Sequence, residues 1–146
     1  MSFWQLASTF FYLGKLPIAP GSWASLGALL IWIFLPLSYT LQIILIILLF
    51  IIGIISSNKM IIEMNDHDPS EVVIDEATGM GITLFMLPHS ITIYSMAFIL
   101  FRIFDIFKPS FIYRVQNLPG GWGIMLDDVF AGIFCWLICR GLLTIL

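Results

Sequence analysis

Two pairs of adjacent acidic residues are the part of this sequence best suited to chemistry, Asp75 with Glu76 and Asp127 with Asp128. Each pair borders a long uncharged run, and the second pair follows a glycine-rich stretch at residues 120–123. Unpaired carboxylates beside apolar segments are costly to bury, so such acids usually bind a cation. Oxygen ligands from separate segments, without a set of cysteines or histidines, suit Mg²⁺. The pattern therefore favours a magnesium site at these junctions, with at least one ligand from Asp75 and Glu76. The alternatives for that pair are a solvated helix face or a structural ion pair with Arg102 or Lys108.

A second group of charges lies between the two acidic pairs, where Arg102, Asp105 and Lys108 follow one another at intervals of three. This spacing places all three on one side of a helix that Pro109 should end. In one interpretation Asp105 only neutralises two cations at a membrane interface. In the other, Arg102 and Lys108 bind an anion such as phosphate, while Asp105 orients one of them or joins the metal ligands.

The glycines before the second acidic pair suggest an anion site. Gly120 and Gly121 allow close approach of the backbone, and a glycine-rich loop that leads into a helix presents free N–H groups to an anion. Asp127 or Asp128 could instead be no more than the N-cap of the following helix. Capping needs one carboxylate, however, and the sequence has two.

Two further stretches have simpler structural explanations. Asp68, Pro69 and Glu71 have the spacing of a capping box at the start of a helix. Ser22 is a candidate N-cap for the apolar segment that follows it, and the turn before it carries Lys15. Lys15 could also face a phosphate.

The composition is that of an integral membrane protein. Of the 146 residues, 60% are hydrophobic and 10% are charged, whereas soluble domains have about 25% charged residues. No charged residue occurs at positions 16–58, 77–101 or 129–139, so these runs are the candidate membrane segments. All nine acids fall within residues 63–76 and 105–128. The chemistry must therefore lie between the membrane segments.

The first uncharged run predicts a helical hairpin, residues 22–37 and 41–55, that turns at Pro36. Each arm is shorter than the ~20 residues that cross a typical bilayer core. The hairpin places Lys15 and Lys59 on one side, which the positive-inside rule makes cytoplasmic. The N-terminal residues 1–12 are expected to form a short interfacial helix.

The second uncharged run is broken at Pro88, so it is either one kinked span or two short arms that return to the same side. The return is favoured because it allows both acidic windows to build one site on the cytoplasmic side. Residues 129–146 then form a terminal span. The expected fold is all-α: a compact multi-helix integral membrane bundle with short, partly re-entrant or kinked helices, in one domain of residues 1–146.

Neither the cysteines nor the histidines have the spacing of a metal site. Cys135 and Cys139 are expected to be packing residues in the last apolar run. His67 and His89 are interpreted as structural or incidental.

Four ordered motifs, which together cover nearly the whole chain, resemble the phosphatidylglycerophosphatase A family. They are Pro17-x-Ala19-Pro20-Gly21-Ser22, Val73-Ile74-Asp75-Glu76-x-x-Gly79, Phe101-Arg102-x-Phe104-Asp105-x-x-Lys108-Pro109 and Gly120-Gly121-x-Gly123-Ile124-Met125-x-Asp127-Asp128-x-x-Ala131-Gly132.

The resemblance implies a Mg²⁺-dependent phosphatase of the bacterial inner membrane. It would convert phosphatidylglycerophosphate to phosphatidylglycerol and inorganic phosphate, the last step of phosphatidylglycerol synthesis, with its site on the cytoplasmic side. Carried over residue by residue, the resemblance implies metal ligands at Asp75, Glu76, Asp127 and Asp128, and a phosphate site at Arg102, Asp105 and Lys108. Taken together with the patterns above, the expected catalytic residues are Asp75, Glu76, Asp105, Asp127 and Asp128. The expected phosphate-binding residues are Arg102, Lys108, Gly120, Gly121 and Lys15.

The expected partners are a phospholipid substrate and the lipid bilayer, without nucleic acid. Water activated by a carboxylate and an aspartyl-phosphate intermediate are both chemically competent routes. The main alternative function is a divalent metal-ion transporter or channel, because acids in a membrane bundle also mark ion pathways. A transporter should carry its acids in the middle of its spans, whereas here they lie at segment ends beside arginine and lysine. The oligomeric state stays open.

Overall fold

The computed structural model of the chain describes residues 2–34 and 38–146, which contain seven α-helices, one short 3-10 helix and no strand. The predicted all-α fold is therefore confirmed. The turn expected at Pro36 lies outside the described residues. The helices are α1 (Phe3–Ser8), the 3-10 helix η1 (Leu13–Lys15), α2 (Pro20–Phe34), α3 (Tyr39–Met64), α4 (Ile74–Leu84), α5 (Ile91–Phe107), α6 (Ser110–Val115) and α7 (Gly121–Ile145).

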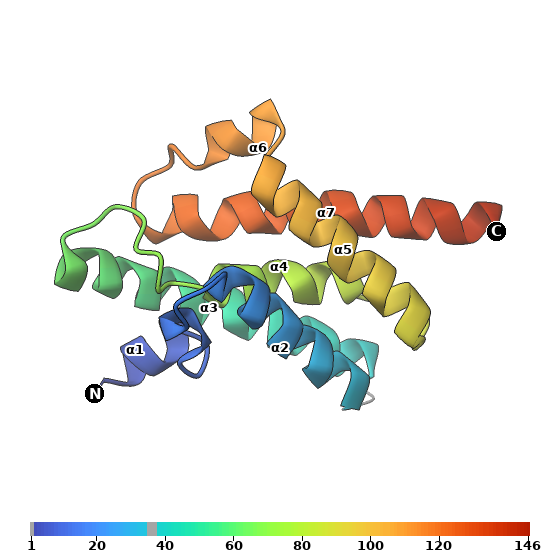
Figure 1. Ribbon diagram of the computed structural model, residues 1–146, viewed down its shortest axis with the longest axis horizontal. Helices are drawn as coiled ribbons and strands as arrows, with labels where there is room; N and C mark the ends of the chain where they lie inside the picture. The colour runs from blue at the N-terminus through green and yellow to red at the C-terminus, as the bar shows by residue number, and fades with distance from the viewer. Residues whose placement is uncertain (1, 35–37) are drawn as a thin grey trace.

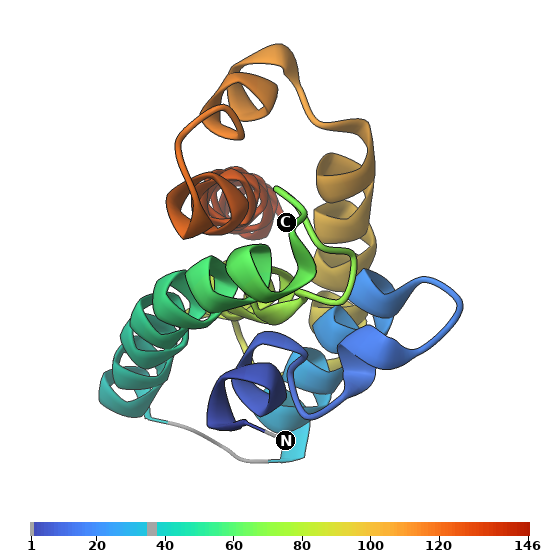
Figure 2. The ribbon, with the colours of Figure 1, turned by 90° about the vertical axis from the view of Figure 1, so that its left-hand side faces the viewer.

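The short helix α4 is the centre of the bundle. It packs against α2, α3, α5 and α7, and nine of its eleven residues are buried. Figure 1 shows α3 and α7 along the long axis of the molecule with α4 between them, and Figure 2 shows the same bundle from its end. The first turn of α4 carries Asp75 and Glu76. One of the predicted acidic pairs therefore lies inside the bundle.

α4 and α7 approach each other closely because both present glycine at their contact. A Cβ added to Gly132 would lie 2.5 Å from the carbonyl oxygen of Gly79, and a Cβ added to Gly79 would lie 2.7 Å from the carbonyl oxygen of Asp128. The Thr83 hydroxyl donates to the Gly79 carbonyl at 2.9 Å and lies 3.4 Å from that of Gly132. Small residues of this kind let helix backbones pack without intervening side chains.

The break at Pro88 separates two helices, as the favoured topology predicted: α4 ends at Leu84 and α5 begins at Ile91. The expected N-terminal helix is also present as α1, which packs against α3. There the Gln5 side chain donates to Glu63 at 3.0 Å, and the Lys59 ammonium lies over the Trp4 ring.

Three helix boundaries differ from expectation. α3 is 26 residues long and not a short arm, because the polar residues after Ile55 continue the helix until Asn65 ends it in the left-handed conformation. α2 begins at Pro20, where the Ala19 carbonyl accepts from the N–H of Ser22, so Ser22 lies inside the helix and is not its cap. α7 begins at Gly121, so Asp127 and Asp128 lie in its second turn.

The predicted capping box at Asp68 is also wrong. The Asp68 N–H donates to the Asp66 carboxylate in a local turn, and α4 starts only at Ile74. The N–H of Val73 donates to the carbonyl of Ser8 at 2.9 Å, which ties this loop to the N-terminal segment. A tertiary hydrogen bond therefore sets the approach to α4.

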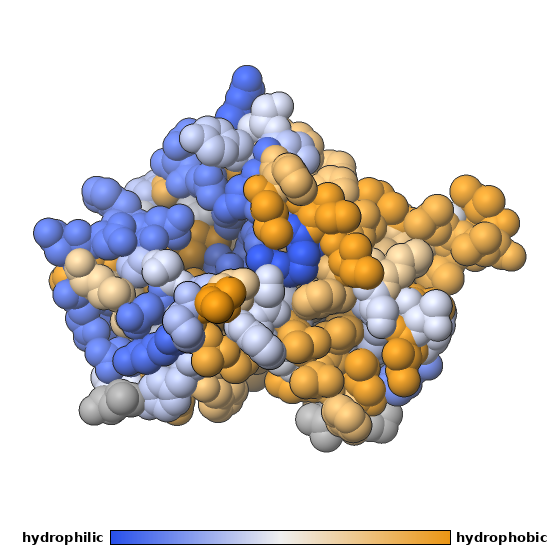
Figure 3. Space-filling model, viewed as in Figure 1, coloured by the Kyte–Doolittle hydropathy of each residue, from blue (hydrophilic) through white to orange (hydrophobic). Residues whose placement is uncertain are grey.

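The surface is polar on one side and apolar on the other. Figure 3 shows hydrophilic residues gathered around α1 and the N-terminal end of α7, and hydrophobic residues over α5 and the C-terminal end of α7. The exposed apolar side chains include Ile99 and Ile103 of α5 and Leu137 and Leu142 of α7. α3 and α7 are long and apolar enough to cross a membrane.

Replacing Gly132 by alanine should destabilise the protein, because the new methyl group has no room against the α4 backbone. We expect the free energy of unfolding to fall by about 1–3 kcal/mol, the usual cost of overpacking. Thermal unfolding in detergent, followed by circular dichroism, measures the change. Gly141→Ala is the matched control in the same helix, since its Cβ would meet nothing within 4 Å. Equal stability of both variants would show that the helices are not in close contact.

Candidate active site

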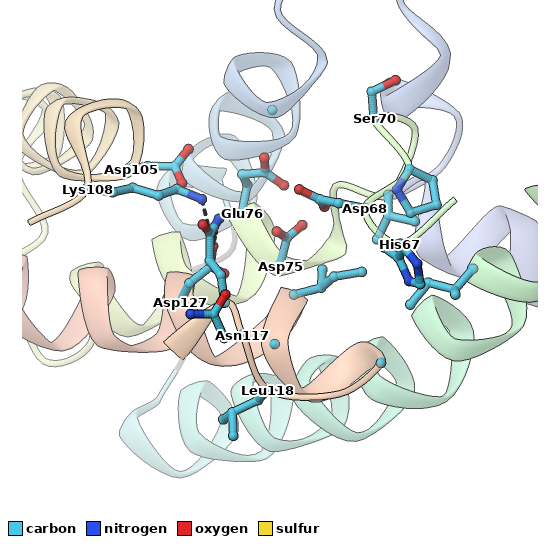
Figure 4. Close-up of a pocket in the computed structure, with 18 of the residues that line it drawn as sticks. His67, Asp68, Ser70, Asp75, Glu76, Asp105, Lys108, Asn117, Leu118 and Asp127 are labelled. Carbon is cyan, nitrogen blue, oxygen red and sulfur yellow. Dashed lines mark hydrogen bonds and ion pairs between the residues drawn. The ribbon is translucent and has the colours of Figure 1, made fainter. Parts of the chain in front are cut away.

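Five carboxylates from three helices converge beside the N-terminal end of α4. Asp75 and Glu76 come from α4, Asp105 from α5, and Asp127 and Asp128 from the second turn of α7. Asp75 is 9% exposed, Asp127 3% and Asp128 1%. Figure 4 shows four of these side chains turned toward a common space. The two acidic windows of the sequence therefore build one cluster.

The cluster divides into two overlapping groups of three. Within each group, one carboxylate oxygen from each residue lies within 4.8 Å of the others. One group consists of Asp75, Asp127 and Asp128, and the other of Glu76, Asp105 and Asp128. Asp128 belongs to both.

Two cations pair with members of the cluster. The Lys108 ammonium donates to the Asp127 carboxylate at 2.7 Å, and the Gln116 amide donates to the same oxygen at 3.1 Å. The Arg102 guanidinium donates to Asp105 at 2.7 Å, one turn away on α5, and to the Ser25 hydroxyl of α2 at 3.3 Å. Asp105 therefore neutralises one cation and not both, because Lys108 ends α5 and pairs with Asp127 of α7.

The cluster keeps an excess of negative charge. Five carboxylates and two paired cations leave three formal negative charges without a partner cation in the described part of the chain. Among the described residues, four buried oxygens of the cluster also have no hydrogen-bond partner: Asp75 Oδ1, Glu76 Oε2 and both carboxylate oxygens of Asp128. Buried unpaired charge is strongly unfavourable.

The pKa shifts follow from this burial. Burial raises the pKa of Asp75 well above its usual value, and the neighbouring Glu76 adds to the rise. Burial also raises the pKa of Glu76. For Lys108, burial lowers the pKa, but the charge and hydrogen bond of Asp127 raise it by more, so the net shift is upward and the ammonium stays protonated. The site thus favours added positive charge.

These residues fit a metal ion. The orphaned oxygens of Asp75, Glu76 and Asp128 are hard ligands, and neither group of three contains cysteine or histidine. Carboxylate oxygen suits Mg²⁺, Ca²⁺ and Mn²⁺. Asp75, Asp127 and Asp128, or Glu76, Asp105 and Asp128, would hold the ion.

A cavity of about 760 Å³ opens onto the cluster. Asp75, Glu76, Asp105 and Asp127 line it, together with Lys108. On the other side of the cavity lie His67, Asp68 and Ser70 from the loop before α4, as Figure 4 shows. The space is larger than a phosphate group requires, so it can hold the remainder of a polar headgroup.

The predicted phosphate-binding residues are not all brought together. Lys108 and Gly120 line the cavity, whereas Arg102 and Lys15 do not. Lys15 is exposed and lies over the Tyr12 ring. The N–H of Gly121 donates to the Asn58 side chain at 2.7 Å, so this donor is already used.

Sequence reasoning missed the polar residues that support the site. Gln116 fixes Asp127, and Asn58 of α3 fixes the start of α7. His67, expected to be structural or incidental, lines the cavity. For these supporting residues the sequence offered one signal, the amide of Asn58 at the end of an apolar run. Such a residue type does not reveal which group it will bond.

The fold and site together define a class: an all-helical protein with membrane-type helices and a buried acidic centre that could bind a metal ion beside a lysine. The sequence profile of one family, phosphatidylglycerophosphatase A, matches residues 6–143. The chain belongs to this family and is a phosphatase.

Of three similar proteins, two carry the name of the family. A protein of Escherichia coli named phosphatidylglycerophosphatase A is 37% identical, with 89% of this chain and 77% of the relative aligned. One of the same name from Haemophilus influenzae is 38% identical over 83% of this chain and 77% of its own length. A Bacteroides thetaiotaomicron protein named putative phosphatidylinositol-3-phosphatase is 39% identical over 91% of this chain and 89% of its own length. No solved structure matches the chain.

Replacing Lys108 by glutamine should abolish most activity if a substrate phosphate binds in this cavity, because the cavity loses its lysine ammonium. Loss of one electrostatic contact to the transition state typically lowers kcat about 100- to 1,000-fold. Phosphate release by the purified variant measures the effect. Arg114→Gln on α6 is the control, since Arg114 is exposed and outside the cavity. An equal loss of activity in both variants would indicate a general effect of removing positive charge and not a role of Lys108 in the cavity.

Proposed function

We propose that this protein is a Mg²⁺-dependent lipid phosphatase that hydrolyses phosphatidylglycerophosphate to phosphatidylglycerol and inorganic phosphate, the last step of phosphatidylglycerol synthesis. The observation that carries the proposal is the buried cluster of carboxylates with unpaired oxygens next to Lys108, in a chain of this family. These carboxylates repel a negatively charged phosphate monoester unless cations lie between them. In phosphoryl-transfer enzymes the cation is usually Mg²⁺ bound to the phosphate.

Bound at the carboxylates, Mg²⁺ would supply charge neutralisation and polarise the phosphoryl group. The chain's own residues would do the rest. Lys108, fixed by Asp127, presents its ammonium to the cavity and offsets charge on the phosphate oxygens. Gln116 restrains Asp127, so that the lysine and the carboxylate keep one geometry.

Arg102 acts from behind the cavity wall. It does not line the cavity, but its guanidinium is held by both Asp105 and Ser25. In this position it fixes the Asp105 carboxylate, which does line the cavity, and reduces the repulsion among the acids. We therefore assign Arg102 a positioning role, and Lys108 the direct contact with phosphate.

We propose that the protein lies in the bacterial inner membrane as a multi-pass protein with its site on the cytoplasmic side. Support comes from the two helices long enough to cross a membrane and from the polarity of the surface. The cavity lies toward the polar side, beside the loop at residues 66–70. A lipid can then remain in the bilayer while its headgroup enters the cavity.

A divalent-cation transporter fits less well. The acids gather near the N-terminal ends of α4 and α7, and two of them are held by basic side chains. Ion pathways require carboxylates along the depth of the membrane.

Purified protein in detergent should release phosphate from phosphatidylglycerophosphate with Mg²⁺ and not with EDTA. Asp128→Asn should lower the rate by about 100-fold or more, since the variant removes a charge on which metal binding depends. Circular dichroism confirms that the variant folds. Glu63→Gln is the matched control, because Glu63 is exposed and lies outside the cavity. No release by folded wild-type protein would refute the proposal.

A second headgroup is supported by the relative from Bacteroides thetaiotaomicron, whose name specifies phosphatidylinositol 3-phosphate. The cavity has room for a hydroxyl-rich headgroup of either kind. We expect a higher kcat/KM for phosphatidylglycerophosphate than for phosphatidylinositol 3-phosphate, measured in the same micelles. The opposite ratio would replace the substrate and leave the phosphatase assignment unchanged.

A further inference from the structure

The two groups of carboxylates lie around one residue, and this arrangement suggests more than a single ion. Each group offers three oxygens close enough to bind one cation, and Asp128 is their shared member. A carboxylate has two oxygens, so one residue can serve two ions at once. Two-metal centres with ions roughly 3.5–4 Å apart are common in enzymes that transfer phosphoryl groups.

The surroundings of Asp128 leave both of its oxygens free to bind cations. It is 1% exposed, and neither of its oxygens has a hydrogen-bond partner in the described part of the chain. Its neighbour Asp127 differs, because one oxygen of Asp127 accepts from Lys108 and Gln116 and the other from the Asp128 N–H at 2.8 Å. Both oxygens of the buried Asp128 carboxylate are therefore available to bind cations.

The other ligands divide evenly between the two groups. In the first group Asp75 has a buried oxygen that no hydrogen bond from the described residues reaches, and in the second group Glu76 has one. Each group also contains one acid already paired with a basic residue: Asp127 with Lys108, and Asp105 with Arg102. Each position thus combines the shared acid, one unpaired acid and one paired acid.

The charge balance favours two ions over one. The cluster and its two basic partners carry three excess negative charges. A single divalent cation leaves the site net negative, so it would repel a phosphate. A second divalent cation makes it net positive, which attracts the phosphate dianion.

We propose that the site binds two divalent cations side by side, bridged by Asp128, with Asp75 and Asp127 completing one position and Glu76 and Asp105 the other. The inference rests on the proposed function, because the second cation is needed to make the site attractive to a phosphate. It is tested through metal binding, which does not depend on turnover.

The probe is Mn²⁺, which takes the same oxygen ligands as Mg²⁺ and is paramagnetic. Metal-free wild-type protein in detergent is titrated while free Mn²⁺ is followed by electron paramagnetic resonance. We expect about two Mn²⁺ per chain, as in two-metal centres, and a spin-coupled spectrum at low temperature. One Mn²⁺ per chain, or two with uncoupled spectra, would overturn the bridged pair.

Variants test which acids form each of the two metal positions. Glu76→Gln and Asp75→Asn should each reduce binding to about one Mn²⁺ and abolish the spin coupling, as expected if each removes a ligand from one position. Asp128→Asn should weaken both positions. Glu63→Gln is the control and should retain both ions. Retention of two coupled ions by Glu76→Gln would exclude the assigned second position.

The Mn²⁺-binding result and the phosphate-release result test different claims. Two coupled ions without phosphate release from any phospholipid would support the metal pair and refute the proposed function. Phosphate release from phosphatidylglycerophosphate by a protein that binds one Mn²⁺ would support the proposed function and refute the metal pair.

Discussion

The excess negative charge at the centre of the bundle is the constraint on which the rest of the structure depends. Five carboxylates within a largely apolar protein repel one another, and two basic residues compensate only part of that repulsion. The first turn of α4 helps, because the positive end of a helix dipole stabilises Asp75 and Glu76. Proton uptake by the buried acids, whose pKa values burial raises, supplies part of the remaining compensation. A cation at the cluster would supply the rest, and its binding would then be coupled to folding.

The close crossing of α4 and α7 places the acids within reach of one another. A Cβ on Gly79 would contact the backbone of Asp128, so the glycine that permits the crossing lies directly against the central acid. With a larger residue there, α7 would move outward and carry Asp127 and Asp128 away from Asp75. The small residues of α4 are therefore part of the site, although none of them binds anything.

The residues that form this cluster could be predicted better than their geometry. The acid pairs, Lys108 and the helical fold follow from residue type and hydrophobic pattern, which are local properties. The partner of Lys108 could not be predicted, because Asp127 is 19 residues away and the competing Asp105 lies one turn away on the same helix. Likewise, Asp68 has the local pattern of a helix cap, but a hydrogen bond from Val73 to Ser8 starts α4 later. Tertiary contacts decided both cases.

The length of α4 explains how a site of this kind can act on a lipid. Eleven residues of helix rise about 16 Å, roughly half the ~30 Å of a bilayer core, so α4 cannot cross the membrane. Its N-terminal end, with Asp75 and Glu76, lies toward the polar side of the bundle (Figures 1 and 3), whereas just after its C-terminal end the Trp136 indole of α7 donates to the Phe85 carbonyl at 2.7 Å. The acids therefore lie at the depth of lipid headgroups in the proposed orientation. In that orientation a lipid phosphate would reach Lys108 and the proposed cations while its acyl chains stayed in the hydrocarbon.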